Sequence, residues 1–141
     1  MDIVLQDSGN YILRFDAQEE VISLLGEFMA AQGLDAISFY GIGSASSIEL
    51  GYYNSNLKEY RRKPYYDSLE VISFMGNGSK MDDKPVIHAH GLFGHTDFST
   101  LGGHVFKMVT LATCEIYVTK LTGLLKRKNN PTFNLNLLEK N

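Results

Sequence analysis

The feature that most limits the fold of this chain is a series of short apolar runs that begins at Ala36. The runs are rich in β-branched and aromatic residues, and Gly, Asn, Pro and Asp residues separate them. Runs of this kind with such separators are typical of consecutive β-strands joined by turns. We therefore expect strands near 36–42, 45–53, 57–63, 68–76, 85–93, 103–111 and 113–120.

One helix is expected before these strands. Residues 10–15 alternate as a strand does, and Asp16 with Glu19 three residues later forms a capping box, which predicts a helix start. Apolar residues then recur at helical spacing, and Gly33 is a suitable C-cap. The apolar face consists of Val21, Leu24, Leu25, Phe28 and Met29.

A last strand is expected near the end of the sequence. After Pro131, Phe133, Leu135 and Leu137 alternate with asparagines, which predicts a strand with one buried face. One helix with many strands predicts an α+β domain with a mainly antiparallel sheet.

Size and composition indicate one globular domain over residues 1–141. The 141 residues are enough for one ordinary core, 44% of them are hydrophobic, and the net charge is −3. No apolar run reaches the 18 residues of a membrane span, so we expect no membrane partner. The lack of a secretory signal pattern at the start and the single cysteine, Cys114, favour a cytoplasmic protein in which Cys114 is buried.

Several local patterns are interpreted as connections or surface loops. The basic runs 61–63 and 126–128 are typical of solvated loops. The glycines of 41–44 lack the third glycine and the helix of a phosphate loop, and a tight strand connection accounts for them better. Residues 77–79, Asn-Gly-Ser, indicate a turn after a strand.

All four histidines lie within seventeen residues, and they are the strongest chemical signal in the sequence. In an extended strand, His88 and His90 point to the same face and lie roughly 6.5 to 7 Å apart. Two imidazoles at that spacing can tilt toward one ion, and an adjacent strand must supply a third ligand. His104 follows a turn-like stretch and opens an apolar run, so it is placed to be that ligand.

Three histidines with an open position suit zinc, which a water molecule would complete as a tetrahedral complex. The predicted metal ligands are therefore His88, His90 and His104. His95 is interpreted as a solvated loop residue. The alternative is that the histidines are exposed or hydrogen-bonded strand residues without a metal.

The order of these segments resembles the plants-and-prokaryotes-conserved (PPC) domain family. The resemblance covers roughly residues 10–138, and its most specific part is a His-x-His motif followed by Gly-Gly-His. The matching segments are Tyr11–Arg14, Gly41–Ser44, Leu69–Ser73 with Gly76–Asn77, His88–His90, Gly102–Val105 and Glu115.

The resemblance implies an α+β fold with a bent antiparallel sheet and one packed helix, assembled as a homotrimer. In prokaryotic members, the histidines that match His88, His90 and His104 form a metal site near a subunit boundary, with zinc the expected ion. Arg14 and Glu70 also fall on positions characteristic of the family, and a buried or interface ion-pair role is expected for them. Arg14 could equally be an exposed strand charge.

Three functions remain open at this point. The first is a metal-binding homotrimer with an assembly, recognition or DNA-associated regulatory role, in which the ion is structural or regulatory. The second is an enzyme in which a His₃-bound water attacks a carbonyl or phosphoryl group, with Asp97 or Glu115 as base; neither has a spacing that fixes it near the ion, and no catalytic residue is assigned. The third is DNA binding, which plant members of the family suggest and the net negative charge disfavours.

A cupin-like enzyme also begins with His-x-His in a β-fold. That pattern needs a glutamate a few residues later, and residues 92–95 supply none. This interpretation therefore ranks below the PPC resemblance. The sequence does not indicate a particular small-molecule ligand or any cofactor besides the metal.

Overall fold

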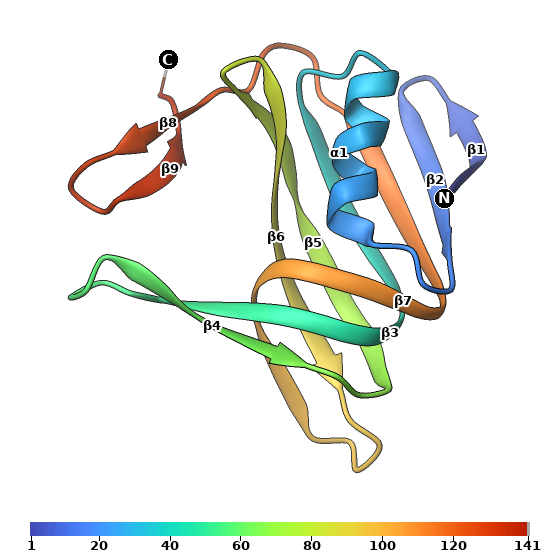
Figure 1. The fold of residues 1–141 in the computed structure, drawn as a ribbon. Helices are drawn as coiled ribbons and strands as arrows, with labels where there is room; N and C mark the ends of the chain where they lie inside the picture. The colour runs from blue at the N-terminus through green and yellow to red at the C-terminus, as the bar shows by residue number, and fades with distance from the viewer. Residues whose placement is uncertain (141) are drawn as a thin grey trace.

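The computed structural model describes residues 1–140, which form one helix and two antiparallel sheets (Figure 1). The sheet of seven strands has the order β1-β2-β7-β6-β5-β3-β4, and β8 and β9 form a separate hairpin. The elements are β1 (Asp2–Asp7), β2 (Asn10–Asp16), α1 (Val21–Ala31), β3 (Ile37–Asn54), β4 (Glu59–Tyr65), β5 (Leu69–Met81), β6 (Lys84–Gly94), β7 (Thr100–Lys120), β8 (Arg127–Asn130) and β9 (Leu135–Leu138). The predicted mainly antiparallel α+β fold is confirmed.

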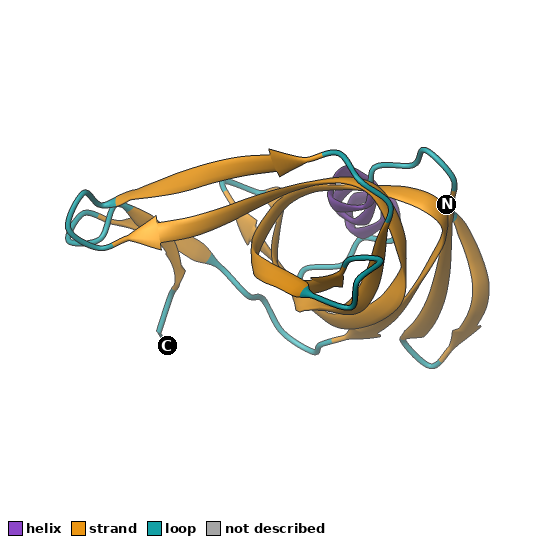
Figure 2. Ribbon diagram, turned by 90° about the horizontal axis from the view of Figure 1, so that it is seen from below, coloured by secondary structure: helices purple, strands orange, loops and turns teal. Residues whose placement is uncertain are grey.

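Four strands of the large sheet close into a ring. β3 pairs with β5, β5 with β6, β6 with β7, and β7 again with β3. Figure 2 shows these strands curving around the ring, with α1 beside one end of it. The closure depends on the length and bend of β3 and β7, because each of these strands pairs with three others.

For each of these two long strands, the sequence pattern predicts two shorter strands, whereas the structure has one continuous strand. Segments 36–42 and 45–53 are one strand, and so are 103–111 and 113–120. The glycines at 41 and 43 mark a register shift inside β3 rather than a connection between strands. Gly43 has a φ of 153°, and a Cβ there would lie 2.4 Å from the carbonyl oxygen of Thr113. Glycine therefore allows β3 to bend while it stays paired with β7.

The helix begins later than the capping box predicts. Its N-cap is Glu20, whose carboxylate accepts hydrogen bonds from the backbone N–H groups of Ile22 and Ser23. The same carboxylate accepts a hydrogen bond from the N–H of Met108 at 3.0 Å, so it also fixes the helix start to β7. Glu19 does bond the backbone N–H of Asp16, as in a capping box, but this bond closes the turn that precedes the helix.

The predicted end and buried face of the helix are confirmed. Gly33 has a φ of 61° and donates to Ala30, while Leu34 donates to Met29, which is the hydrogen-bond pattern of a Schellman motif. Four of the five predicted face residues are buried, and Leu24 packs partly buried against the core. The core beneath them contains Phe15, Phe74 and Phe93, and Cys114 is fully buried as expected.

Two segments that the sequence favours as connections contain strand residues. Residues 77–79 lie inside β5, which continues to Met81. The basic run 61–63 lies in β4, in agreement with the strand predicted near 57–63 and not with a loop. The basic run 126–128 enters β8, which pairs with β9. The sequence also gave no indication of β1, whose residues are exposed and pair only with β2.

The C-terminal hairpin lies beside the projecting β3–β4 hairpin, and Figure 1 shows both on the same side of the ring. Tyr53 donates a hydrogen bond from its hydroxyl to the carbonyl of Phe133, and Asn134 donates to the carbonyl of Lys58. The predicted buried face of the last strand is wrong, because Phe133 and Leu137, two of its three apolar residues, are 46% and 38% exposed. Among residues 1–140, no helix has the length and apolarity needed to cross a bilayer.

Candidate metal centre

His88, His90 and His104 come together because β6 and β7 are paired. His90 and His104 are direct register partners across these strands. His88 precedes His90 by two residues and shares its face, while Ala89 between them points into the core with 1% exposure. The pairing that sequence spacing suggested is therefore present.

The three imidazoles are close enough to hold one ion. One nitrogen from each ring lies within 4.8 Å of the others. In a tetrahedral zinc site with bonds of about 2.0 to 2.1 Å, ligand atoms lie roughly 3.4 Å apart. Small rotations of the rings would bring the three nitrogens from their present separation to that of zinc ligands.

His104 is the most enclosed of the three rings. Its Nδ1 is buried and has no hydrogen-bond partner among the residues that the structure describes. Burial, with smaller contributions from the nearby His88 and His90, lowers the pKa of His104 to about 4. The ring is thus neutral at pH 7, which is the form that binds a metal, and a buried nitrogen without a partner fits a ligand atom.

Aromatic side chains form the wall behind His104. The rings of Tyr60 and Phe106 have centroids 5.0 and 4.5 Å from that of His104. Arg62 lies over Phe106 at 3.9 Å and pairs with Glu49, which shields the far side of this wall. These contacts restrict the orientation of the His104 ring.

Arg127 is a site residue that the sequence did not reveal. Its guanidinium donates from Nη2 to Nδ1 of His88 at 3.2 Å and to Oδ1 of Asn77 at 2.8 Å. It also donates from Nε to Oγ of Ser79 at 2.8 Å. Burial, followed by the positive charge of Arg127, lowers the pKa of His88. The only sequence signal was a basic run that is also typical of surface loops.

A cavity of about 570 Å³ opens beside the triad. His88 and His104 line it, whereas the exposed His90 does not. The β8–β9 hairpin provides the opposite side with Arg127, Asn129, Leu135 and other residues. The volume is within the range of small-molecule sites.

The two carboxylates considered as catalytic bases are not part of this cluster. Asp97 lies in the turn between β6 and β7 and accepts hydrogen bonds from the backbone N–H and hydroxyl of Ser99, which lower its pKa. Glu115 is an exposed residue of β7 opposite Arg14 and Ile42. His95 lies in the same turn as Asp97, 3.3 Å from Asp67, and so it is a loop residue as predicted but is partly shielded.

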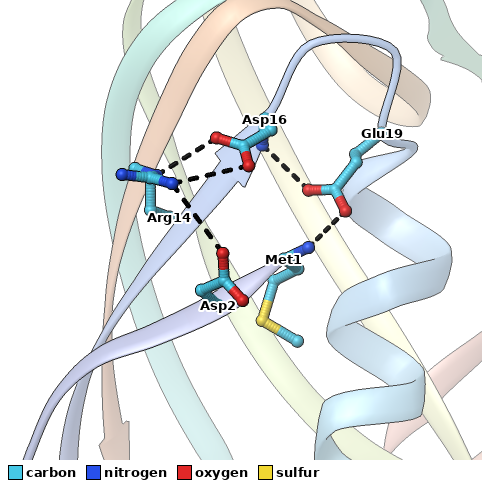
Figure 3. Close-up of polar contacts among 5 residues, drawn as sticks. All are labelled: Met1, Asp2, Arg14, Asp16 and Glu19. Atoms are coloured by element: carbon cyan, nitrogen blue, oxygen red, sulfur yellow. Dashed lines mark hydrogen bonds and ion pairs between the residues drawn. The ribbon is translucent and has the colours of Figure 1, made fainter.

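Arg14 lies in a surface cluster of charges near the first residue, shown in Figure 3. Its guanidinium lies 3.1 Å from Asp16 and 3.8 Å from Asp2, and its side chain is 49% exposed. The N-terminal ammonium of Met1 pairs with Glu19 beside it. The prediction of a buried ion pair for Arg14 is therefore wrong within this structure. Glu70 is exposed and has no ion pair among residues 1–140. An interface role for either stays a prediction.

Comparison with known proteins agrees with this fold. The family model of the Plants and Prokaryotes Conserved (PCC) domain, another abbreviation of the PPC family, matches residues 5–122. A PPC protein from Pyrococcus horikoshii is 30% identical, with 93% of this chain and 91% of that chain covered and a TM-score of 0.87. No curated protein matches the chain.

Two further solved structures are similar over nearly their full length. A metal-containing protein from Archaeoglobus fulgidus is 30% identical, with 99% of both chains covered and a TM-score of 0.88. A Bacteroides thetaiotaomicron protein with a provisional DNA-binding description is 26% identical, with 96% of this chain and 94% of that chain covered and a TM-score of 0.92.

Proposed function

The chain belongs to the Plants and Prokaryotes Conserved domain family, and from that premise we propose that it is a zinc-binding homotrimer with an assembly or recognition role. His88, His90 and His104 would be the protein ligands of the ion. The observation that carries the proposal is the convergence of three ring nitrogens within 4.8 Å, one of them buried without a partner.

The chemistry of the donors supports zinc. Neutral imidazoles are ligands that zinc favours, and three of them leave one position of a tetrahedron open. The similar Archaeoglobus fulgidus protein is metal-containing, which supports a metal in this chain as well. When bound, the ion would supply a Lewis acid at the open position.

Exposed apolar residues beside the triad support assembly. A row of register partners runs across the outside of the ring from Tyr117 through Tyr40 and Met75 to His90. Tyr40 and Met75 are 60% and 55% exposed, and the rings of Tyr40 and Tyr117 are stacked. A second copy of the chain placed on this row would cover apolar surface and reach the edge of the metal site.

A DNA-associated role is the second candidate, supported by the provisional description of the Bacteroides thetaiotaomicron protein. The basic residues of β4 offer a small contact surface, but Arg62 is already paired with Glu49 and the net charge is −3. Binding that depends on phosphate contacts would weaken steeply with salt. A gel-shift series over salt concentration tests this role.

The metal proposal is tested by elemental mass spectrometry together with light-scattering mass on the untagged protein. We expect about one zinc ion per chain in the wild type and a loss of it in His104→Ala. His95→Ala is the matched control, because His95 lies outside the triad. A wild-type protein without stoichiometric metal would overturn the metal site, and a monomeric mass would overturn the trimer.

A further inference from the structure

The cavity beside the triad carries positive charge without a matching negative group. His88, His104 and Arg127 line it, and no Asp or Glu lines it among the residues that the structure describes. Three neutral imidazoles would leave the double positive charge of a bound zinc ion uncompensated. A partly buried site with this charge favours an anionic ligand.

Arg127 and a metal ion compete for the same lone pair. Nη2 of Arg127 donates to Nδ1 of His88, and an arginine side chain can only donate. A neutral imidazole has one nitrogen with a free lone pair, so His88 cannot accept this bond and bind an ion at once. Metal binding through His88 would therefore release one N–H of Arg127 beside the ion.

The released N–H would stay in place, because the guanidinium has other partners. Ser79, Asn77 and the carbonyl of Asn136 accept hydrogen bonds from it, each at 2.8 Å. These bonds hold Arg127 in the cavity wall whether or not His88 is available. A donor that is held in advance binds an anion at a lower entropic cost.

The rest of the cavity wall is largely apolar. Ile22, Val86, Phe106, Leu135 and Leu137 lie along it. A hydrocarbon chain buried here would strengthen binding by removing apolar surface from water. A free phosphate ion would use the positive charge but leave this wall uncovered.

We propose that the cavity binds a small organic carboxylate. Its head group contacts the metal ion and Arg127, and its hydrocarbon part lies against the apolar wall. The proposal rests on metal binding by the triad, as set out under the proposed function. It adds the class of ligand and the residue that recognises it.

The test uses full-length protein loaded with Co²⁺, whose visible absorption reports the ligands around the ion. The probes are butyrate, n-butanol of the same length without charge, and inorganic phosphate. We expect butyrate to change the Co²⁺ spectrum and to saturate at millimolar concentration, with no change from n-butanol. No butyrate effect, an equal effect of n-butanol, or a phosphate effect alone would overturn the carboxylate proposal.

Failure of the underlying metal site is recognised before any anion is added. In that case Co²⁺ gives no spectrum of a bound ion, and both proposals fall. When Co²⁺ binds but butyrate does not act, only the carboxylate proposal falls.

Arg127→Gln separates recognition from a loss of structure. It removes the competitor for His88 and the anion contact together, so we expect tighter Co²⁺ binding and butyrate binding weaker by about tenfold. A variant that merely unfolds the site would weaken both, and that result, or unchanged butyrate binding, would overturn the role of Arg127.

A second pair of variants tests the place of the anion. Asn129→Asp adds a negative charge to the cavity lining, whereas Lys128→Gln lowers the net charge equally at a neighbouring residue outside it. Both residues are exposed in β8, so both variants should fold. We expect only Asn129→Asp to weaken butyrate binding, and equal effects would overturn a site in this cavity.

Discussion

His90 and His104 are direct partners across β6 and β7, although His104 follows His90 by fourteen positions in the sequence. The hairpin register alone decides that these two rings meet. A shift of one residue in either strand would move one ring to the opposite face of the sheet. The candidate metal centre is thus a product of strand pairing.

Replacing His90 should affect metal binding more than folding. Its side chain is exposed, so we expect His90→Ala to change the free energy of unfolding by less than about 0.5 kcal/mol. Loss of one of three ligands should weaken zinc binding by at least about tenfold. Competition with a chromophoric chelator measures the affinity, thermal unfolding of the metal-free protein measures stability, and His95→Ala is the control. Unchanged zinc affinity in His90→Ala would contradict the three-ligand site.

Replacing Glu20 should destabilise the fold, because its carboxylate caps α1 and bonds Met108 of β7. We expect Glu20→Ala to lower the free energy of unfolding by about 1 to 3 kcal/mol, measured by urea denaturation. Glu27→Ala removes an exposed carboxylate of the same helix and should have little effect. Equal effects of the two substitutions would show that the link to β7 is unimportant.

Two glycine substitutions should have opposite effects. A Cβ on Gly76 would lie 2.0 Å from the carbonyl oxygen of His88, so Gly76→Ala should cost at least about 2 kcal/mol and disturb the site. Gly26 lies in α1 with no atom within 4 Å of a Cβ, and Gly26→Ala should stabilise the protein by about 0.5 to 1 kcal/mol. Thermal unfolding checks both, and a neutral Gly76→Ala would rule out this close approach of β5 and β6.

Cys114 should be unreactive in the folded protein. Burial raises the pKa of its thiol to about 12, so almost no thiolate forms at about pH 8. Ellman's reagent should modify the thiol quickly in guanidinium chloride and hardly at all in buffer. Rapid modification in buffer would mean that β7 opens readily around Cys114.

Glu19 should give the fold a dependence on acidic pH. A hydrogen bond from the N-terminal ammonium, more than any other cause, lowers the pKa of Glu19 from its usual 4.5. A carboxyl group whose pKa is lower in the folded than in the unfolded state stabilises the fold above pH 4.5. This stabilisation is lost as the pH falls through the pKa of the folded state. The difference in unfolding free energy between wild type and Glu19→Gln should therefore be constant near neutral pH and shrink below pH 4.5.

The contribution of Glu19 should stay below about 1 kcal/mol, as for other surface ion pairs. Urea titrations over a pH series measure it. Acetylation of the N-terminal amine is the control, since it removes the main partner and should reduce the pH-dependent difference, while the hydrogen bond from the N–H of Asp16 remains. A difference that grows as pH falls would contradict the ion pair.

Local sequence patterns predict an element correctly where a residue type in that context has one common structural role. Gly33 ends the helix as predicted, because glycine adopts its φ of 61° without strain. The same patterns misled at Gly41 and Gly43, since a glycine that allows close backbone approach cannot be told from a turn glycine by its neighbours. The Asn-Gly-Ser pattern at 77–79 likewise predicts a turn, although Asn77 and Ser79 lie inside β5 and accept hydrogen bonds from Arg127.

The sequence by itself determined the strand-rich α+β character, the helix face and the three histidines, because alternation, helical spacing and the imidazole group are local properties. Only the tertiary structure decided that β3 and β7 are unbroken strands that close a ring, and that Arg127 reaches His88 from 39 residues away. It also set the pairing of His90 with His104 as part of the ring. Such relationships depend on strand register and hairpin packing, which bring distant segments together. The residues that make these contacts show no periodic pattern in the sequence from which the contacts could be predicted.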